Sequence, residues 1–365
     1  MSICIVDFKV GGHHGFYLKC VIGLSAVSGF VGHREHLSIV RSCSNVKYIT
    51  CVDEPQGSSS QRMAVLKRHV REHGKPEEFF LLEADQLDIS VLAKQIFDLG
   101  ATVCGIPISG IWFRSNFLYR NSVISGLKKY ILLKLLSRWC DSGGRLFFLD
   151  DALATRVAEL SGIARDEVWC FEPYSNRWKG ARDKHSVVDG NGVTRLLFIG
   201  AQDERKGTSW ALNAIADIGW KGQSRLVVHV AGSITDCAIY GAVERLRACH
   251  IQVLLDDSFL SEESYASAFD LADVVMLPYI GFGGSSGVLI EAAQYRRPVV
   301  ASDSGTVGRL VRDSGMGCVF EVGDPLSFMN AIAGVASKEI VDESFSQVLS
   351  RCSLSGFRSM ISAKC

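Results

Sequence analysis

This sequence lacks a net charge: its 365 residues include 39 basic and 39 acidic side chains. A chain without net charge has no general attraction to a polyanion, so the composition argues against a nucleic-acid-binding protein. Proline is scarce at 7 residues, whereas the 35 glycines predict many tight turns and close backbone contacts. An apolar content of 47% excludes wholesale disorder.

Paired cysteines and long apolar runs are also missing. The 12 cysteines are scattered from Cys4 to Cys365 without a C-x-x-C pair, which favours reduced, mostly buried thiols over disulfides or a zinc site. The N-terminal run resembles a strand rather than a secretion signal. The longest uncharged stretch, residues 274–290, contains a proline and four glycines, unlike a membrane-spanning helix. We therefore expect a cytoplasmic protein.

Short apolar runs alternate with longer segments of helical spacing. The runs are continuous, as in parallel strands that are buried on both faces. The predicted strands are 3–8, 79–82, 102–108, 145–149, 195–199, 226–231, 251–255, 274–277 and 298–301. Such alternation predicts an α/β fold with doubly wound parallel sheets.

A polar stretch rich in glycine, asparagine, lysine and arginine interrupts this alternation in the middle of the chain. We interpret it as a linker, residues 173–192, between two domains at 1–172 and 193–345. Each domain is long enough to bury its own core. We expect the tail, residues 346–365, to form a helix that packs back on the first domain.

The predicted strand 274–277 is followed by a glycine-rich turn and the start of a helix. This segment contains Gly284, Ser285, Ser286, Gly287, Val288 and Glu291. Backbone N–H groups at a helix N-terminus attract an anion, and Glu291 is placed to accept hydrogen bonds from ligand hydroxyls beside it. The alternative is that the glycines only permit a tight connection between a strand and a helix.

A second turn in the same domain carries two adjacent cations. The predicted strand 195–199 ends at Gly200, and Arg205 and Lys206 precede the next helix. Arginine binds phosphate bidentately and lysine binds it as a compact charge, so the pair suits a diphosphate. A solvated basic pair next to Gly207 is the alternative.

In their order, these segments resemble the nucleotide-binding domain of GT-B glycosyltransferases of the family-four type, the glycosyl transferases group 1. The matching segments are Gly200 with Lys206-Gly207, Ala231-Gly232, 272–279, 285–293 and 297–305. The resemblance implies a GT-B fold, with two Rossmann-like domains facing across a cleft that holds a nucleotide sugar. It also implies transfer of the sugar, with retention of configuration, from a nucleotide diphosphate donor to a hydroxyl acceptor.

By that resemblance, Arg205 and Lys206 neutralise the departing diphosphate, the turn from Gly284 to Val288 donates backbone N–H groups to it, and Glu291 holds the ribose hydroxyls. Fixed donors of this kind stabilise a leaving group as its charge develops. We therefore expect neither a metal nor another cofactor. The family usually has glutamate where this chain has Gly283 and arginine where it has Ala201, so the donor sugar is not predicted.

The first predicted strand leads into a second glycine-rich segment, Gly11, Gly12, His13 and His14. It resembles the loop with which the first domain of GT-B enzymes touches the donor. One of the two histidines would then contact the phosphate or the acceptor hydroxyl, or carry a proton, because histidine titrates near neutral pH. Helix capping and a solvent-exposed histidine pair are the alternatives.

Three further features are given simpler interpretations. Glu83 follows a predicted strand and is interpreted as an acidic turn rather than a metal ligand. His33 and His36 have helical spacing without a cysteine pair, so we expect a solvated face. The basic, apolar segment 125–139 suits an anionic membrane surface and a lipid-linked acceptor, although apolar residues on all its sides favour a helix packed in the first domain.

The sequence thus predicts a glycosyltransferase that uses a nucleotide-sugar donor. Its acceptor would be a hydroxyl of a glycan, a lipid-linked glycan or a small glycoside, with peripheral contact at the inner face of a membrane as an option. Two alternatives stay open, namely a non-catalytic nucleotide-sugar-binding subunit, which the glycine at position 283 favours, and a nucleotide-sugar epimerase on the same fold.

Overall fold

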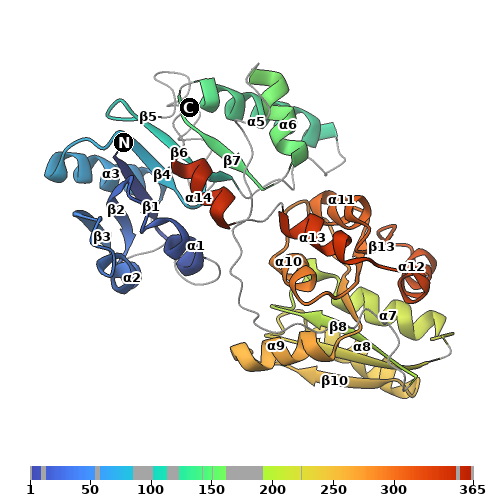
Figure 1. The fold of residues 1–365 in the computed structure, drawn as a ribbon. Helices are drawn as coiled ribbons and strands as arrows, with labels where there is room; N and C mark the ends of the chain where they lie inside the picture. The colour runs from blue at the N-terminus through green and yellow to red at the C-terminus, as the bar shows by residue number, and fades with distance from the viewer. Residues whose placement is uncertain are drawn as a thin grey trace. The chain divides into compact units, whose positions relative to one another are not determined.

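The computed structural model describes residues 2–9, 14–53, 58–84, 102–112, 123–141, 143–149, 151–161, 192–222, 224–350 and 354–362. The chain divides into two compact units, each built around its own sheet (Figure 1). The first unit comprises Met1–Pro173 and Ser353–Cys365, and the second comprises Tyr174–Cys352. The predicted α/β fold with doubly wound parallel sheets is confirmed.

The sheet of the first unit has the strand order β3-β2-β1-β4-β6, with β7 parallel to β6 on its other side. Its strands are β1 (Ile3–Asp7), β2 (Val27–His33), β3 (Tyr48–Val52), β4 (Glu78–Leu81), β6 (Ile106–Trp112) and β7 (Leu146–Phe148). All of these pair in parallel. The chain order reverses between β1 and β4, in the middle of the sheet.

The predicted strand 102–108 is in fact a hairpin. β5 (Thr102–Val103) pairs antiparallel with β6 across a turn at Cys104 and Gly105. Both turn residues have positive φ angles, 56° and 77°. A two-residue turn with this backbone reverses the chain, so a continuous apolar run was wrongly predicted as one strand.

Helices cover both faces of the first sheet. They are α1 (His14–Val21), η1 (Arg34–His36), α2 (Leu37–Arg41), α3 (Ser59–His73), α5 (Val123–Asp141), α6 (Asp151–Ser161) and α14 (Leu354–Ser362). Side chains of α3, α5 and α6 share one core, and those of α1, α2 and α14 share the other. Within α5, Leu133, Leu136 and Trp139 are buried, so this part of the predicted segment 125–139 packs in the unit.

The tail forms two helices rather than one. Residues Asp342–Ser350 are α13, whose Phe345 and Val348 are buried in the second unit. α14 lies beside α1 in the first unit (Figure 1). There the Phe357 ring meets the Tyr17 ring edge-on at 6.1 Å between centroids, and Arg358 Nε donates to the Cys20 carbonyl at 2.7 Å.

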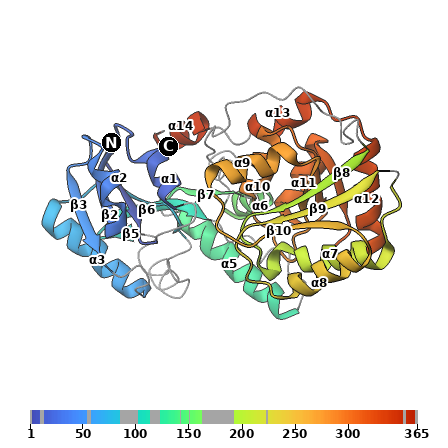
Figure 2. The ribbon, with the colours of Figure 1, turned by 90° about the horizontal axis from the view of Figure 1, so that it is seen from below.

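The second unit contains a six-stranded parallel sheet with the order β10-β9-β8-β11-β12-β13. Its strands are β8 (Val193–Ile199), β9 (Arg225–Ala231), β10 (Gln252–Asp256), β11 (Val274–Leu277), β12 (Val299–Ser302) and β13 (Gly317–Phe320). Helices α7 (Thr208–Ile218), α8 (Ala238–Ala248) and α12 (Pro325–Ser337) pack on one face of this sheet. Helices α9 (Glu262–Leu271), α10 (Gly287–Gln294), α11 (Gly305–Ser314) and α13 pack on the other (Figure 2).

Candidate functional site

The two predicted turns of the second unit meet where its strand order reverses. In open parallel sheets, ligands bind outside the carboxyl ends of the strands at such a reversal, here between β8 and β11. Gly200 directly follows β8. A β-carbon placed on it would lie 3.4 Å from Lys206 Nζ and 3.8 Å from Val288 Cγ2. The structure therefore brings Gly200, Lys206 and the start of α10 together.

The basic turn is a short 3₁₀ helix, η5 (Glu204–Lys206), packed directly on the end of β11. The Asp203 side chain caps it by accepting from the Lys206 backbone N–H at 3.2 Å. Gly207 follows with φ 67°, and a β-carbon there would lie 2.0 Å from the Pro278 carbonyl oxygen. Only glycine permits this contact, which fixes where the adjacent cations lie.

The Lys206 ammonium is half-buried and is held by neutral oxygens. It donates to Tyr279 Oη at 3.0 Å and to the Ile199 carbonyl at 3.3 Å, and it lies 4.9 Å from the centre of the Tyr279 ring. Among the described residues, no carboxylate forms an ion pair with it. An ammonium held in this way can bind an anion without first leaving a described carboxylate.

Arg205 lies on the outer side of the same turn. Its guanidinium carbon is 4.7 Å from the centre of the Phe282 ring, in the glycine-rich turn, and its Nη2 is 3.4 Å from Asp203 Oδ2. Because both partners of this ion pair are well exposed, the pair contributes little stability. A phosphate would compete easily with Asp203 for the guanidinium.

The glycine-rich turn runs into α10 without a side-chain cap. Ser286 precedes the helix in an extended conformation, and its hydroxyl lies 2.8 Å from Tyr279 Oη instead of capping the helix. The first turn of α10 has no acidic residue. Gly284 is buried against the Phe282 ring, whereas Ser285 is half-exposed and Gly287 exposed. Such an uncapped N-terminus is suited to an anion.

Glu291 lies on the second turn of α10. Its carboxylate accepts a hydrogen bond from the Tyr265 hydroxyl of α9, and the residue is half-exposed. This contact orients the carboxylate without burying it. A carboxylate can accept several hydrogen bonds, so Glu291 can also accept from the hydroxyl groups of a ligand.

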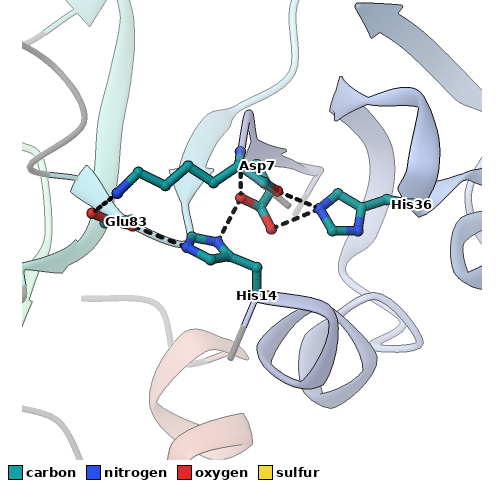
Figure 3. A network of polar contacts seen from close by, with 5 residues as sticks. Asp7, His14, His36 and Glu83 are labelled. Carbon is teal, nitrogen blue, oxygen red and sulfur yellow. Dashed lines mark hydrogen bonds and ion pairs between the residues drawn. The ribbon is translucent and has the colours of Figure 1, made fainter. Parts of the chain in front are cut away.

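The first unit carries a network of charged side chains at the corresponding place, where its strand order reverses between β1 and β4 (Figure 3). Asp7 ends β1, Glu83 follows β4 and His14 begins α1. His14 Nδ1 lies 2.9 Å from Asp7 Oδ1, and its Nε2 lies 3.0 Å from Glu83 Oε2. Lys9 Nζ adds a contact of 2.5 Å to Glu83 Oε1. All but Lys9 are buried.

These contacts hold His14 as an imidazolium. Burial alone would lower its pKa, but the hydrogen bonds to Asp7 and Glu83 outweigh burial and raise the pKa to about 9. Burial would raise the pKa of Glu83, yet its bonds to His14 and Lys9 lower it to about 2. An imidazole that donates from both nitrogens has no lone pair for a proton. The geometry therefore favours a fixed cation over a proton carrier at His14. Gly11, Gly12 and His13 lie outside the described residues.

The predicted solvated face at His33 and His36 is wrong. Both histidines are buried, at 6% and 4% exposure. His36 Nε2 donates to the Lys9 carbonyl at 2.7 Å and lies 3.3 Å from Asp7 Oδ2, and His33 Nε2 lies 3.0 Å from the Asp53 carbonyl. Hydrogen bonds to distant parts of the chain satisfy both rings, which local spacing does not reveal.

Because of this network, we expect the protein to lose stability at alkaline pH. The folded state raises the His14 pKa above its usual 6.5, so this contribution is complete below pH 6.5 and disappears as the pH rises through about 9. Between these values we expect the free energy of unfolding to fall by about 3 kcal/mol. Urea denaturation at pH 6.5 and 9.5 measures the fall. The fall should be clearly smaller in His14→Gln, where the raised pKa values of His36 and Cys20 still contribute, and an equal fall in that variant would contradict the assignment.

The described residues contain no group of three or more histidine, cysteine, aspartate or glutamate side chains arranged to hold a metal ion. Within the same ranges, no helix has both the length and the apolar character needed to cross a membrane.

Comparison with known proteins finds a family match in the second unit. Residues 193–338 match the family model described as glycosyl transferases group 1. A curated relative, phosphatidyl-myo-inositol mannosyltransferase of Mycobacterium leprae, is 28% identical over 164 residues, which cover 41% of this chain and 39% of that protein. The match thus spans about two fifths of the relative.

Solved structures extend the similarity in fold to the whole chain. HepE of Anabaena with UDP and glucose has a TM-score of 0.63 at 14% identity, covering 99% of this chain and 98% of HepE. The lipopolysaccharide outer core galactosyltransferase WaaB has a TM-score of 0.66 at 12% identity, covering both chains completely. A glycosyltransferase from Rickettsia africae also reaches 0.66, at 12% identity, over 98% of this chain and 95% of that one. The chain therefore has the fold of GT-B glycosyltransferases, and residues 193–338 of its second unit match the glycosyl transferases group 1 model.

Proposed function

We propose that this protein is a glycosyltransferase that moves a sugar, with retention of configuration, from a nucleotide diphosphate sugar to a hydroxyl acceptor. One observation carries the proposal: the Lys206 ammonium lies beside the uncapped start of α10, with Tyr279 linking the two. The family match in the second unit supports it. So does HepE, which was crystallised with UDP-glucose.

In this proposal the second unit stabilises the leaving nucleotide diphosphate. Breaking the glycosidic bond places negative charge on the diphosphate oxygens. Lys206, Arg205 and the N–H groups at the start of α10 are already oriented toward that charge, so they stabilise the transition state more than the bound donor. Glu291 accepts hydrogen bonds from the ribose hydroxyls. These groups supply the electrostatic stabilisation without a metal ion.

We assign the acceptor to the first unit. Its buried network offers a fixed imidazolium at His14 and the part-exposed ammonium of Lys9 at the carboxyl edge of the sheet. The exposed side of α5 carries Tyr130, Ile131 and Lys134, which supports peripheral contact with an anionic membrane and a lipid-linked acceptor. Free cysteines in the described part of the chain suit a cytoplasmic enzyme at the inner face of that membrane.

A donor screen followed by a transfer assay tests the function. We expect one class among UDP-, GDP-, ADP- and TDP-sugars to raise the melting temperature, because a ligand that binds only the folded state stabilises it by mass action. That donor is then supplied with free glycosides or with glycolipids in anionic vesicles. Mass spectrometry should detect the sugar on an acceptor, with the anomeric configuration retained by NMR and full activity in EDTA.

The same experiment separates the alternatives. Donor binding without transfer to any acceptor would identify a binding subunit, and a changed sugar in the absence of acceptor would identify an epimerase. If no nucleotide sugar raises the melting temperature, the donor site itself is wrong. If the protein fails to sediment with the anionic vesicles, the proposed membrane contact is wrong, but the proposed transfer reaction is unaffected.

A further inference from the structure

We propose that Tyr279 is a positioning residue that aims two hydrogen-bond donors, the Lys206 ammonium and the Ser286 hydroxyl, at a single diphosphate. The inference rests on the proposed donor site and adds to it a residue that touches neither phosphate nor sugar. It arises from a chain of contacts that crosses from the basic turn to the start of α10.

The chain of contacts is short and enclosed. Tyr279 follows β11 and is only 4% exposed. Its phenolic oxygen lies 3.0 Å from Lys206 Nζ and 2.8 Å from Ser286 Oγ. Ser286 is itself 7% exposed. One phenol therefore joins two side chains that are eighty positions apart in sequence but adjacent in space.

The number of protons that each group can donate fixes the direction of these hydrogen bonds. An ammonium only donates, so Tyr279 Oη accepts from Lys206. A buried phenol has one proton to place, and Ser286 Oγ is the acceptor within reach among the described residues. Tyr279 therefore donates to Ser286. The Ser286 hydroxyl proton is then left for another acceptor, and Ser286 makes no cap hydrogen bond at the start of α10.

The contacts of the Lys206 ammonium also limit where it can move. Two of the three ammonium protons are engaged by Tyr279 and by the Ile199 carbonyl, and the aromatic ring lies beneath the charge at 4.9 Å. The third proton and the Ser286 hydroxyl are thus held ready for one anion. Without the phenol oxygen, both donors would have to be oriented at the moment of binding, which weakens affinity.

Tyr279→Phe tests this inference, because it removes the hydroxyl and keeps the ring. The probe is inorganic pyrophosphate, which needs no knowledge of the base or sugar, and its affinity is measured by calorimetry. We expect about a tenfold loss of affinity, as for one hydrogen bond to a charged group. The matched control is Tyr240→Phe, which removes an exposed hydroxyl that donates to Asp257 at 2.5 Å and should leave pyrophosphate affinity unchanged.

A double-mutant cycle with Ser286→Ala separates positioning from a structural role. If Tyr279 acts through Ser286, the double variant should lose clearly less affinity than the product of the two single losses. Melting temperatures within a few degrees of the parent show that the variants are folded. Wild-type affinity in Tyr279→Phe, or strictly multiplicative losses, would overturn the inference. Undiminished affinity in Lys206→Ala would instead overturn the donor site on which it rests.

Discussion

Lys206→Ala is expected to lower sugar transfer by about 10²- to 10³-fold, the usual cost of removing one group that stabilises charge in a transition state. The ammonium is held by Tyr279 and Ile199 without an ion pair among the described residues, so its removal leaves no described carboxylate unpaired. The fold should therefore survive. Initial rates of transfer with the donor found by screening measure the loss, and the melting temperature checks the fold.

The control for this variant is Lys221→Ala. Lys221 is exposed and lies between α7 and β9, at the amino end of the strand rather than at the carboxyl edge. It should keep the parental rate. If Lys206→Ala transfers sugar as fast as this control, the assignment of the diphosphate to the basic turn is wrong.

Gly207→Ala is expected to lower the free energy of unfolding by about 3 kcal/mol, combining the strain of a left-handed backbone with overpacking. A β-carbon at this position would lie 2.0 Å from the Pro278 carbonyl oxygen, so either the turn or the end of β11 must move. Either movement shifts Lys206 from Tyr279. The variant should therefore also lose affinity for the donor.

The end of α11 supplies a matched control. Gly315 has the same left-handed backbone, with φ 72° and ψ 10°, but a β-carbon there would meet no atom closer than 3.6 Å. Gly315→Ala should cost about 1 kcal/mol from backbone strain alone and leave donor affinity intact. Urea denaturation and calorimetry compare the two variants. Equal effects at both positions would show that the contact with Pro278 does not hold the turn in place.

The sequence was most informative where an element is continuous and apolar. In the second unit, β11 was predicted with its observed bounds, and β8 and β9 extend the predictions by one or two residues. β2, β3 and β13 were missed. β2 contains Gly29 and Gly32, most of β3 is partly exposed, and β13 begins with Gly317 and is half-buried in its middle, so none shows a distinct apolar run.

The candidate site, too, could be predicted only where its residues belong to one local sequence pattern. Lys206 and Ser286 were predicted because each belongs to a local strand-turn-helix pattern, but the phenol that links them was seen only as part of a strand end. The network around Asp7 was not predicted. Its partners His14, His36 and Glu83 come from separate elements, and the parallel pairing of β1 with β2 and β4 brings them together.

The helix α14 has a consequence for how the protein is made. Phe357 and Ile361 complete a core that begins with Ile3 and Ile5, so the first unit is interrupted in sequence by the whole of the second. On the ribosome, the second unit emerges and can fold while the first still exposes the apolar surface that α14 later covers. The first unit therefore cannot complete its core until the whole of the second unit has been made, so it reaches its native state after the second has had the chance to fold.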